Sequence, residues 1–495
     1  MIVRLVGSEM CIRDRYASPN SKFYKSQRLE KAMARAMSCI VKVQHDDGTI
    51  DLHSTNFHST PDTAFFVNYL SPVYLTLKGL NEPRLLNLIS NFEIFLKNTS
   101  KCLLVGGAHT ANHRWVICSA LARINHFFPS PKLVSRVEVW LNEGIDLDPD
   151  GQYFERSVGS YSHICNEMFI TMGRLLNRND LLDVARKNLD MTLYYIQPGG
   201  EVFSDASRRD DSHDIQDVSG YYFSYLYFSH VDKNPVYSAV CDLIEKKLTN
   251  KLIHFIPYLL ENKILLNKRV LPSKIPNSYF KKFKHSGVFR FRQSNLDISI
   301  LENNLTFLNL IKGSAVLQSM RLGSTFFGSR GQFKAENTQV KGKQVILTKS
   351  VKHGYFQPFP KDKIPGDGVY SKMPRELRRL SEPQIINYLI TITFLDKITK
   401  VDIKVTGTDN VLVSLEMNFR KGGKLSGVIN DKNRSDSYFL KEGFGTYTKD
   451  GSVINFGPGK IEHQWGTMRG MEEKPYGNTV YVNGHTPFNH VLEIY

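Results

Sequence analysis

The pattern of hydrophobic and polar positions divides the chain into two parts. From residue 27 to about residue 252, apolar residues recur at helical spacing. The pattern predicts helices over residues 27–44, 62–80, 83–99, 112–128, 131–144, 162–177, 181–196, 217–231 and 235–252. These helices are of medium length and richly apolar, without a sustained heptad. Such a series packs as successive antiparallel pairs, so we expect a bundle, a solenoid or a closed α/α toroid.

After residue 270 the apolar period changes to two. Residues 285–292, 296–301 and 385–394 alternate apolar and polar side chains, and Gly, Asn and Asp separate such runs. This pattern predicts an antiparallel β-sandwich. The fold class is therefore α+β with two domains. We expect a helical domain over residues 16–270, a proline-bearing linker over 271–284 and the β-sandwich over 285–495.

The first fifteen residues, MIVRLVGSEMCIRDR, resemble a translated sequencing adapter and lack apolar periodicity. We therefore interpret residues 1–15 as a non-native leader. On this interpretation the natural N-terminus, with any signal peptide, is missing, and the helical domain is incomplete at its start.

Charge is distributed unevenly. Residues 16–250 carry 24 basic and 26 acidic side chains, whereas residues 251–495 carry 37 basic and 20 acidic ones. The basic surplus favours a polyanionic partner for the second half. No nucleic-acid-binding motif is present, and an acidic polysaccharide fits the charge equally well, so we expect no nucleic acid. The alternative is a solvated basic surface without a function. No apolar run is long enough for a membrane span, and the scattered cysteines indicate neither a disulfide framework nor a metal site.

Two segments of the helical half carry candidate chemistry. The first, residues 106–115, brings Asn112, His113 and Arg114 to the start of a helix, where backbone N–H groups favour anions. Alternatively, Asn112 only caps the helix. The second, residues 148–163, is a loop that enters a helix and presents its polar residues together. These are Glu155, Arg156, Tyr161 and His163. The alternative for Tyr161 is an ordinary packed aromatic ring.

A third segment, residues 205–213, contains the adjacent pair Arg208 and Arg209. Paired arginines suit bidentate recognition of carboxylates. The alternative is a solvated loop held by its own salt bridges.

Together, Asn112-His113 and the loop from Asp150 through Glu155-Arg156-Ser157 to Tyr161 resemble the heparinase II/III-like polysaccharide lyases. This family includes alginate, heparin and oligo-uronide lyases. The order of a helical and a β-rich half matches the family's toroid and sandwich, so the resemblance covers nearly the whole chain.

The resemblance implies that Asn112 and His113 neutralise a uronate carboxylate, with Tyr161 as base and acid. Substrate contacts are then expected from the neighbouring basic side chains, namely Arg114, Arg156, His163, Arg208 and Arg209. Many members carry a His-Gly-His-x-Asp-like motif early in the β-domain, but residues 310–319 here contain no histidine. Since the usual motif for a structural divalent metal is absent, we predict no cofactor. His353, then His463, are the substitute candidates for a third site histidine.

The resemblance predicts a periplasmic or secreted lyase that cleaves a uronate-containing glycan by β-elimination. One rival is a glycoside hydrolase that uses carboxylates such as Asp150, Glu155, Asp205 or Asp210. A second rival is a non-catalytic glycan-binding protein. The particular uronate, endo or exo cleavage, and the oligomeric state stay open at this stage.

The charge distribution generates a first prediction. Affinity for an acidic polysaccharide should fall steeply as ionic strength rises, because salt screens the basic surplus of residues 251–495. Binding measured between low and high salt tests this, and an unchanged affinity would contradict it.

Overall fold

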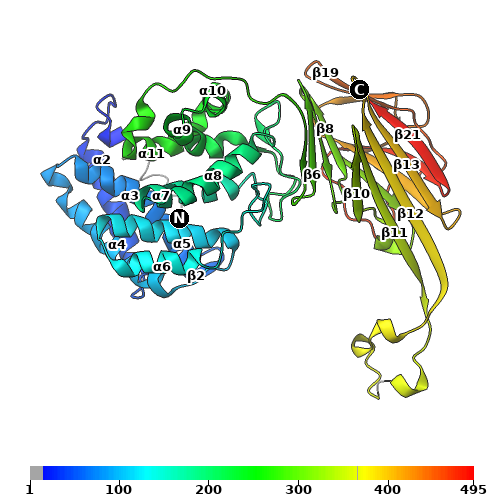
Figure 1. Cartoon of the computed structure of the whole chain (residues 1–495), viewed down its shortest axis with the longest axis horizontal. Helices are drawn as coiled ribbons and strands as arrows, with labels where there is room; N and C mark the ends of the chain where they lie inside the picture. The colour runs from blue at the N-terminus through cyan, green and yellow to red at the C-terminus, as the bar shows by residue number, and fades with distance from the viewer. Residues whose placement is uncertain (1–14, 365) are drawn as a thin grey trace. The chain divides into compact units, whose positions relative to one another are not determined.

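The computed structural model describes residues 15–364 and 366–495, and it divides into two compact units between Pro276 and Asn277 (Figure 1). Apart from Arg15, the predicted leader lies outside the described residues. Within the described part of the chain, no helix has the length and apolar character that a membrane crossing requires.

The first unit is helical (Figure 1). Its helices are α2 (Gln27–Val43), α3 (Thr60–Gly79), α4 (Leu86–Val105), α5 (Ala111–Phe127), α6 (Pro131–Leu141), α7 (Ser162–Leu175), α8 (Asn179–Thr192), α9 (Tyr222–Val231), α10 (Pro235–Leu248) and α11 (Ile256–Glu261). The predicted helices are confirmed, with shifts of a few residues at most ends. The range predicted from residue 217 begins instead with a 3-10 turn, Val218–Tyr221. Two small hairpins that the pattern did not predict are β1 (Ile50–Leu52) with β2 (Asn56–Ser59), and β3 (Glu201–Val202) with β4 (Gln216–Asp217).

Burial separates inner from outer helices. In α2 the buried residues Met33, Met37 and Ile40 form one stripe, as on a surface helix. By contrast, α5 and α7 are buried along most of their length and pack against each other. The candidate residues at the N-terminal ends of α5 and α7 therefore stand on rigid elements.

The helical core encloses ionisable groups. Glu261 on α11 accepts hydrogen bonds from Arg123 on α5, at 3.3 Å, and from Arg174 on α7, at 2.7 Å. Glu167 on α7 has only the Tyr258 hydroxyl at hydrogen-bond distance, 3.2 Å away, among the described contacts. Burial raises the pKa of Glu167 to about 8, so the carboxyl is largely neutral at neutral pH.

Glu167 generates a prediction about stability. In the unfolded chain this group ionises from about pH 4.5, whereas in the folded chain it stays protonated to about pH 8. Folding is therefore progressively destabilised as pH rises between these values, by roughly 3 kcal/mol at pH 7. Glu167→Gln should remove this dependence, so its stability relative to the unmodified chain should increase from pH 5 to pH 8 in urea unfolding.

The matched control is Glu442→Gln, which alters an exposed glutamate of the other unit. It should leave the pH dependence unchanged. A stability difference for Glu167→Gln that is the same at every pH would contradict the assignment of a neutral buried carboxyl.

The second unit consists of two large sheets. The nine-stranded sheet has the order β16-β17-β20-β14-β9-β8-β7-β6-β5, and the eight-stranded sheet has the order β10-β11-β12-β13-β21-β19-β18-β15. The first comprises β5 (Ser278–Phe283), β6 (Val288–Gln293), β7 (Leu296–Leu301), β8 (Leu308–Lys312), β9 (Ala315–Ser324), β14 (Leu412–Phe419), β16 (Ile429–Asn430), β17 (Ser437–Phe439) and β20 (Asn478–His485). The second comprises β10 (Asn337–Lys341), β11 (Gln344–Phe356), β12 (Leu380–Phe394), β13 (Thr399–Gly407), β15 (Lys424–Ser426), β18 (Gly445–Lys449), β19 (Ser452–Gly457) and β21 (Phe488–Ile494).

Alternation produces the core of this unit. Along β13, Val401, Ile403 and Val405 are fully buried, while the residues between them are partly exposed. Such residues from both sheets form one hydrophobic cluster. The predicted change to a period of two is confirmed.

Two details of the predicted β-domain are wrong. The expected linker over residues 271–284 contains β5, an edge strand paired with β6. Only Phe283 of β5 is buried, so its sequence lacks a clear alternation. The sheets are also not wholly antiparallel, because β17 pairs with β20 in parallel.

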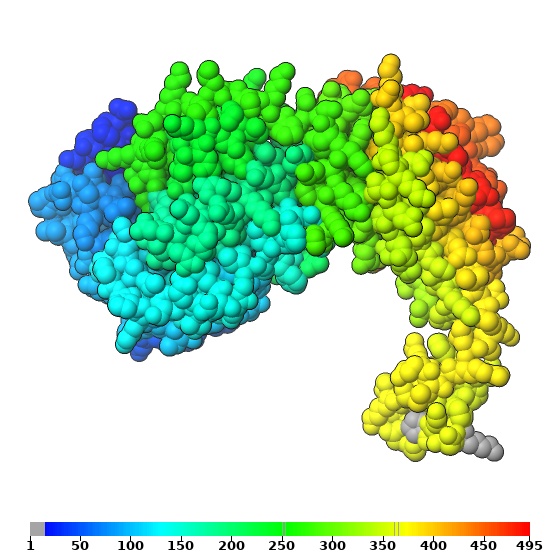
Figure 2. Space-filling view, in the orientation of Figure 1, coloured from blue at the N-terminus to red at the C-terminus, as the bar shows by residue number. Residues whose placement is uncertain are grey.

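The described part of the connection between β11 and β12, residues 357–364 and 366–379, stands away from the remainder of the β unit (yellow in Figure 2). Within it, the guanidinium of Arg378 lies 4.1 Å from the ring centre of Phe359 and 5.5 Å from that of Tyr370. Local cation–π contacts therefore hold this segment together.

Candidate active site

Asn112 is the second residue of α5 and is buried. Its side-chain Nδ2 donates a hydrogen bond of 2.7 Å to Oε2 of Glu155, while Oδ1 has no partner among the described residues. The capping alternative for Asn112 is wrong, because the cap position belongs to Thr110. Instead, the amide side chain turns toward the loop that precedes α7.

Glu155 connects Asn112 to a guanidinium. Its Oε1 lies 3.8 Å from Nη1 of Arg209. Burial raises the pKa of Glu155, and the Asn112 hydrogen bond and the Arg209 charge oppose that effect. The carboxyl is thus desolvated, but it accepts one hydrogen bond from Asn112 and forms an ion pair with Arg209.

Arg209 in turn reaches Tyr161. The guanidinium carbon lies 5.0 Å from the centre of the Tyr161 ring, within cation–π range. A hydrogen bond with the Tyr161 side chain raises the pKa of Arg209. Tyr161 is half-buried at the N-terminal boundary of α7, where its amide donates to the Ser157 carbonyl. Contacts therefore link Asn112, Glu155, Arg209 and Tyr161 in one series.

His113 lies beside this series. Its ring meets the edge of Phe65 at 6.0 Å and of His109 at 4.6 Å between ring centres. Burial, with the neighbouring His109, lowers the pKa of His113 to about 4, so the imidazole is neutral at neutral pH. Its Nδ1 has no hydrogen-bond partner in the described part of the chain. The first turn of α5 therefore carries two polar atoms without a hydrogen-bond partner among the described residues, Oδ1 of Asn112 and Nδ1 of His113.

One carboxylate joins the two loops that carry these groups. Asp211 is buried and accepts hydrogen bonds from the hydroxyls of Ser157, at 2.9 Å, and Ser207, at 2.5 Å. The backbone N–H of Arg208 also donates to the carbonyl of Glu155 at 3.0 Å. At Gly159 a Cβ atom would lie 2.6 Å from Gln216, so only glycine permits this approach.

The other candidate residues of the helical unit occupy different surroundings. Arg114 pairs with Glu143 and Asp146 and stacks on Trp115, so we leave it outside the proposed site. His163 packs against Tyr221 and Gly220, and burial lowers its pKa to about 4.

Arg156 has a positive φ of 53°. Burial, followed by the nearby positive charge of Arg208, lowers its pKa. The two guanidinium groups therefore lie close enough to repel each other.

The two candidate histidines of the β unit differ from each other. His353 on β11 belongs to an aromatic group, 4.6 Å from Phe327 and 5.9 Å from Phe356 between ring centres. By contrast, both ring nitrogens of His463 are engaged, one with the Val413 carbonyl and one with the Trp465 amide. The second arrangement is that of a structural histidine.

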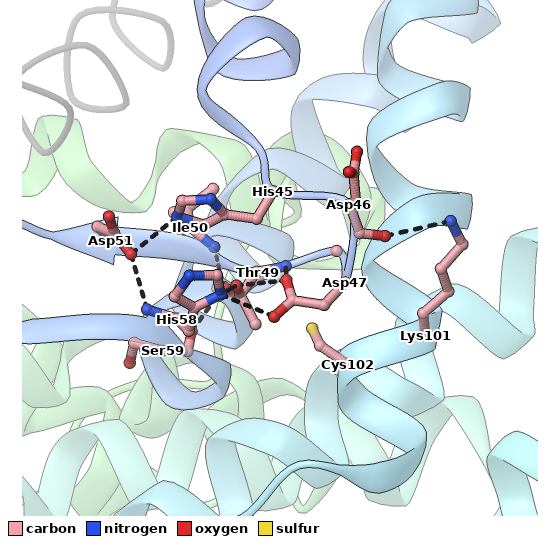
Figure 3. Close-up of polar contacts among 12 residues, drawn as sticks. His45, Asp46, Asp47, Thr49, Ile50, Asp51, His58, Ser59, Lys101 and Cys102 are labelled. Atoms are coloured by element: carbon pink, nitrogen blue, oxygen red, sulfur yellow. Dashed lines mark hydrogen bonds and ion pairs between the residues drawn. The ribbon is translucent and has the colours of Figure 1, made fainter.

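One polar cluster was not indicated by the sequence patterns; it lies on the β1–β2 hairpin and the turn that precedes it (Figure 3). His45 and His58 stack with ring centres 4.0 Å apart; His45 pairs with Asp51 at 3.0 Å and His58 with Asp47 at 2.8 Å. The amide and hydroxyl of Thr49 donate hydrogen bonds to Asp47, and the hydroxyl bond is the main cause that lowers the pKa of Asp47 to about 2. Among the described residues, no group of three His, Cys, Asp or Glu side chains is arranged to hold a metal ion. We interpret the cluster as a structural support of the hairpin.

Comparison with solved structures identifies the fold. The chain is similar to a heparan sulfate lyase HepC mutant from Pedobacter heparinus, at 12% identity over 95% of this chain and 74% of that one, with a TM-score of 0.53. It is similar to heparinase III at 10% identity over 100% and 75%, with a TM-score of 0.55. A chondroitin AC lyase from Streptomyces coelicolor, in complex with chondroitin sulphate, gives 12% identity over 100% and 74%, with a TM-score of 0.56.

No protein-family model matches the sequence, and no curated protein sequence is significantly similar to it. The structural similarity shows a polysaccharide lyase fold of this kind, with a helical N-terminal and a β-rich C-terminal region. The resemblance inferred from the sequence is confirmed at this level.

The contact between Asn112 and Glu155 generates a prediction. Glu155→Ala should lower the free energy of unfolding by about 1–3 kcal/mol, because a buried amide loses its acceptor and Arg209 its partner. Glu155→Gln keeps a carbonyl acceptor and should lose less. Asp210→Ala, which alters an exposed carboxylate of the neighbouring loop, is the control. Urea unfolding measures all three, and an alanine variant as stable as the control would refute the contact.

Proposed function

We propose that this protein is a polysaccharide lyase that cleaves a uronate-containing acidic glycan by β-elimination. The observation that carries the proposal is the series of contacts from Asn112 through Glu155 and Arg209 to Tyr161. It occurs in a fold similar to those of enzymes named as heparan sulfate and chondroitin lyases. We further propose that the helices form an α/α toroid, incomplete at its start, and that the two sheets form a β-sandwich.

The reaction sets three chemical requirements. A uronate lyase removes the proton on C5, next to a carboxylate, and expels the oxygen on C4. The carboxylate must be neutralised so that negative charge can develop on it. A base must take the C5 proton, and an acid must protonate the leaving oxygen.

Asn112 and His113 suit the first requirement. One Nδ2 hydrogen of Asn112 is bonded to Glu155, and the second is available to a substrate carboxylate. Glu155 thereby fixes which way the amide faces and acts as a positioning residue. The neutral imidazole of His113 adds one donor nitrogen, and its other nitrogen can act as base for the opposite C5 epimer.

Tyr161 suits the second and third requirements. The guanidinium carbon of Arg209 lies 5.0 Å from the centre of the Tyr161 ring, so a positive charge stands beside the proposed base. The phenolate takes the C5 proton, and the phenol then returns a proton to the leaving oxygen. Arg156 and Arg208 supply further positive charge for an acidic glycan. The substrate class favours a periplasmic or secreted enzyme.

A glycoside hydrolase is the second candidate, favoured by one observation: burial raises the pKa of Glu155, as in a general acid. Hydrolysis also needs a second carboxylate across the sugar. The acidic neighbours that influence Glu155 are Asp146 and Asp211. Asp146 is bonded to Arg114 and Trp115, and Asp211 to two serines. Both are thus engaged in structural contacts, which disfavours hydrolysis.

An activity screen tests the proposal. The chain is incubated with alginate, heparinoids, chondroitin, hyaluronan and glucuronans, and ultraviolet absorbance and product mass are followed. A lyase produces an unsaturated sugar that absorbs in the ultraviolet, a hydrolase shortens the polymer without this absorbance, and a binding protein leaves the chain length unchanged.

Tyr161→Phe is the sharpest test of mechanism. It keeps the ring and its packing but removes the group proposed to move protons at both C5 and O4. Turnover should fall by more than the ~10²–10⁴ typical of one proton-transfer role, whereas binding of an acidic oligosaccharide should persist. Initial rates of ultraviolet absorbance increase, with calorimetry for binding, measure both.

Asn112→Ala provides a contrast, because it removes a stabiliser of developing charge and leaves the base in place. A loss of ~10²–10³ in turnover is expected. Near-normal release of unsaturated sugar by Tyr161→Phe would overturn the mechanism even if the chain proved to be a lyase.

A further inference from the structure

Phe154 is an exposed aromatic residue within a buried loop. Its two neighbours, Tyr153 and Glu155, expose 3% and 7% of their surface, whereas Phe154 exposes 61%. An exposed phenylalanine contributes nothing to the core, although it stands next to a residue of the candidate site. Single exposed apolar residues are common, so what sets Phe154 apart is its place beside Glu155 and its contact with Arg208.

Arg208 covers part of the Phe154 ring. The guanidinium carbon lies 4.9 Å from the ring centre, Nη1 donates to the Phe154 carbonyl at 3.3 Å, and the Arg208 amide donates to the Glu155 carbonyl at 3.0 Å. Three contacts thus fix the arginine against the ring before any ligand binds. Such preorganisation reduces the entropy lost on binding.

The charge of Arg208 has no carboxylate partner among the described residues, although its own loop is rich in aspartate. Asp205 pairs with His213, and Asp211 accepts hydrogen bonds from two serines. The next arginine along the chain, Arg209, pairs with Glu155. Arg156 brings a second positive charge near Arg208, since the Arg208 charge, after burial, contributes to the lowered pKa of Arg156. An anion bound here would relieve this repulsion.

We propose that Phe154 and Arg208 form a subsite. It binds the sugar next to the uronate that loses its C5 proton. The exposed aromatic surface stacks on the apolar face of the sugar ring, and the guanidinium binds the carboxylate or sulfate of that sugar. The location follows from the chain, since Phe154 adjoins Glu155 and Arg208 adjoins Arg209. The inference rests on the proposed function in that it assigns the ligand to the acidic glycan class.

The test uses the full chain with the additional change Tyr161→Phe, so that oligosaccharides are bound without being cleaved. The probes are tetrasaccharides of chondroitin sulfate, heparan sulfate and alginate, measured by calorimetry. Phe154→Ala and Arg208→Gln should each weaken binding about tenfold, and Phe154→Tyr should retain it because stacking is preserved. In the otherwise unmodified chain, the same changes should raise KM and leave kcat nearly unchanged.

Two surface changes serve as matched controls. Arg35→Gln removes an exposed arginine from α2, and Leu86→Ala removes an apolar side chain of α4 that is 67% exposed. Neither should alter binding, and thermal unfolding should be similar for all variants.

The two proposals fail in different ways. Acidic tetrasaccharides that bind without ever yielding unsaturated product would refute the lyase and leave the subsite standing if Phe154→Ala weakens binding. Unsaturated product with binding unaffected by Phe154→Ala and Arg208→Gln would overturn the subsite alone. A chain that binds none of the probes would overturn the subsite as well.

Discussion

The buried carboxylate of Asp211 is the interaction on which the candidate site depends. Its two oxygens accept hydrogen bonds from Ser157 in one loop and Ser207 in the other. Residues 148–161 and 203–217 are separate in sequence, and apolar contacts alone would not define their register. Together with the bond from the Arg208 amide to the Glu155 carbonyl, the Asp211 bonds hold the loops in the register in which Arg209 reaches both Glu155 and Tyr161.

Burial gives this polar assembly its electrostatic strength. Glu155 is nearly excluded from water, so its interactions with Asn112 and Arg209 are stronger than they would be on the surface. The same exclusion keeps His113 neutral at neutral pH. A substrate carboxylate would therefore encounter donors that are already oriented and poorly hydrated, an arrangement that suits stabilisation of developing charge.

The sequence predicted the elements well because periodicity is a local property. The change of period near residue 270 located both units, and only β5, an edge strand with one buried residue, was taken for a linker. Asn112, His113 and Tyr161 were selected by resemblance, and the structure places Asn112 and Tyr161 at the two ends of one series of contacts. The partners that join them were not predictable, since Asn112 meets Glu155 across 43 positions. Such pairings arise from tertiary packing of loops, which leaves no periodic trace.

The joining of the two loops also has a consequence for local unfolding. The Tyr161 amide is bonded within the first loop, to the Ser157 carbonyl, and the Arg208 amide is bonded between the loops, to the Glu155 carbonyl. If the Asp211 bonds break, both segments lose their common anchor, so they should open as one cooperative unit. Hydrogen exchange at these two amides would then report a single opening event. Glu155 and Arg209, which lie on the two loops, would then be displaced together, whereas Asn112 and His113 stand on α5 and would keep their places.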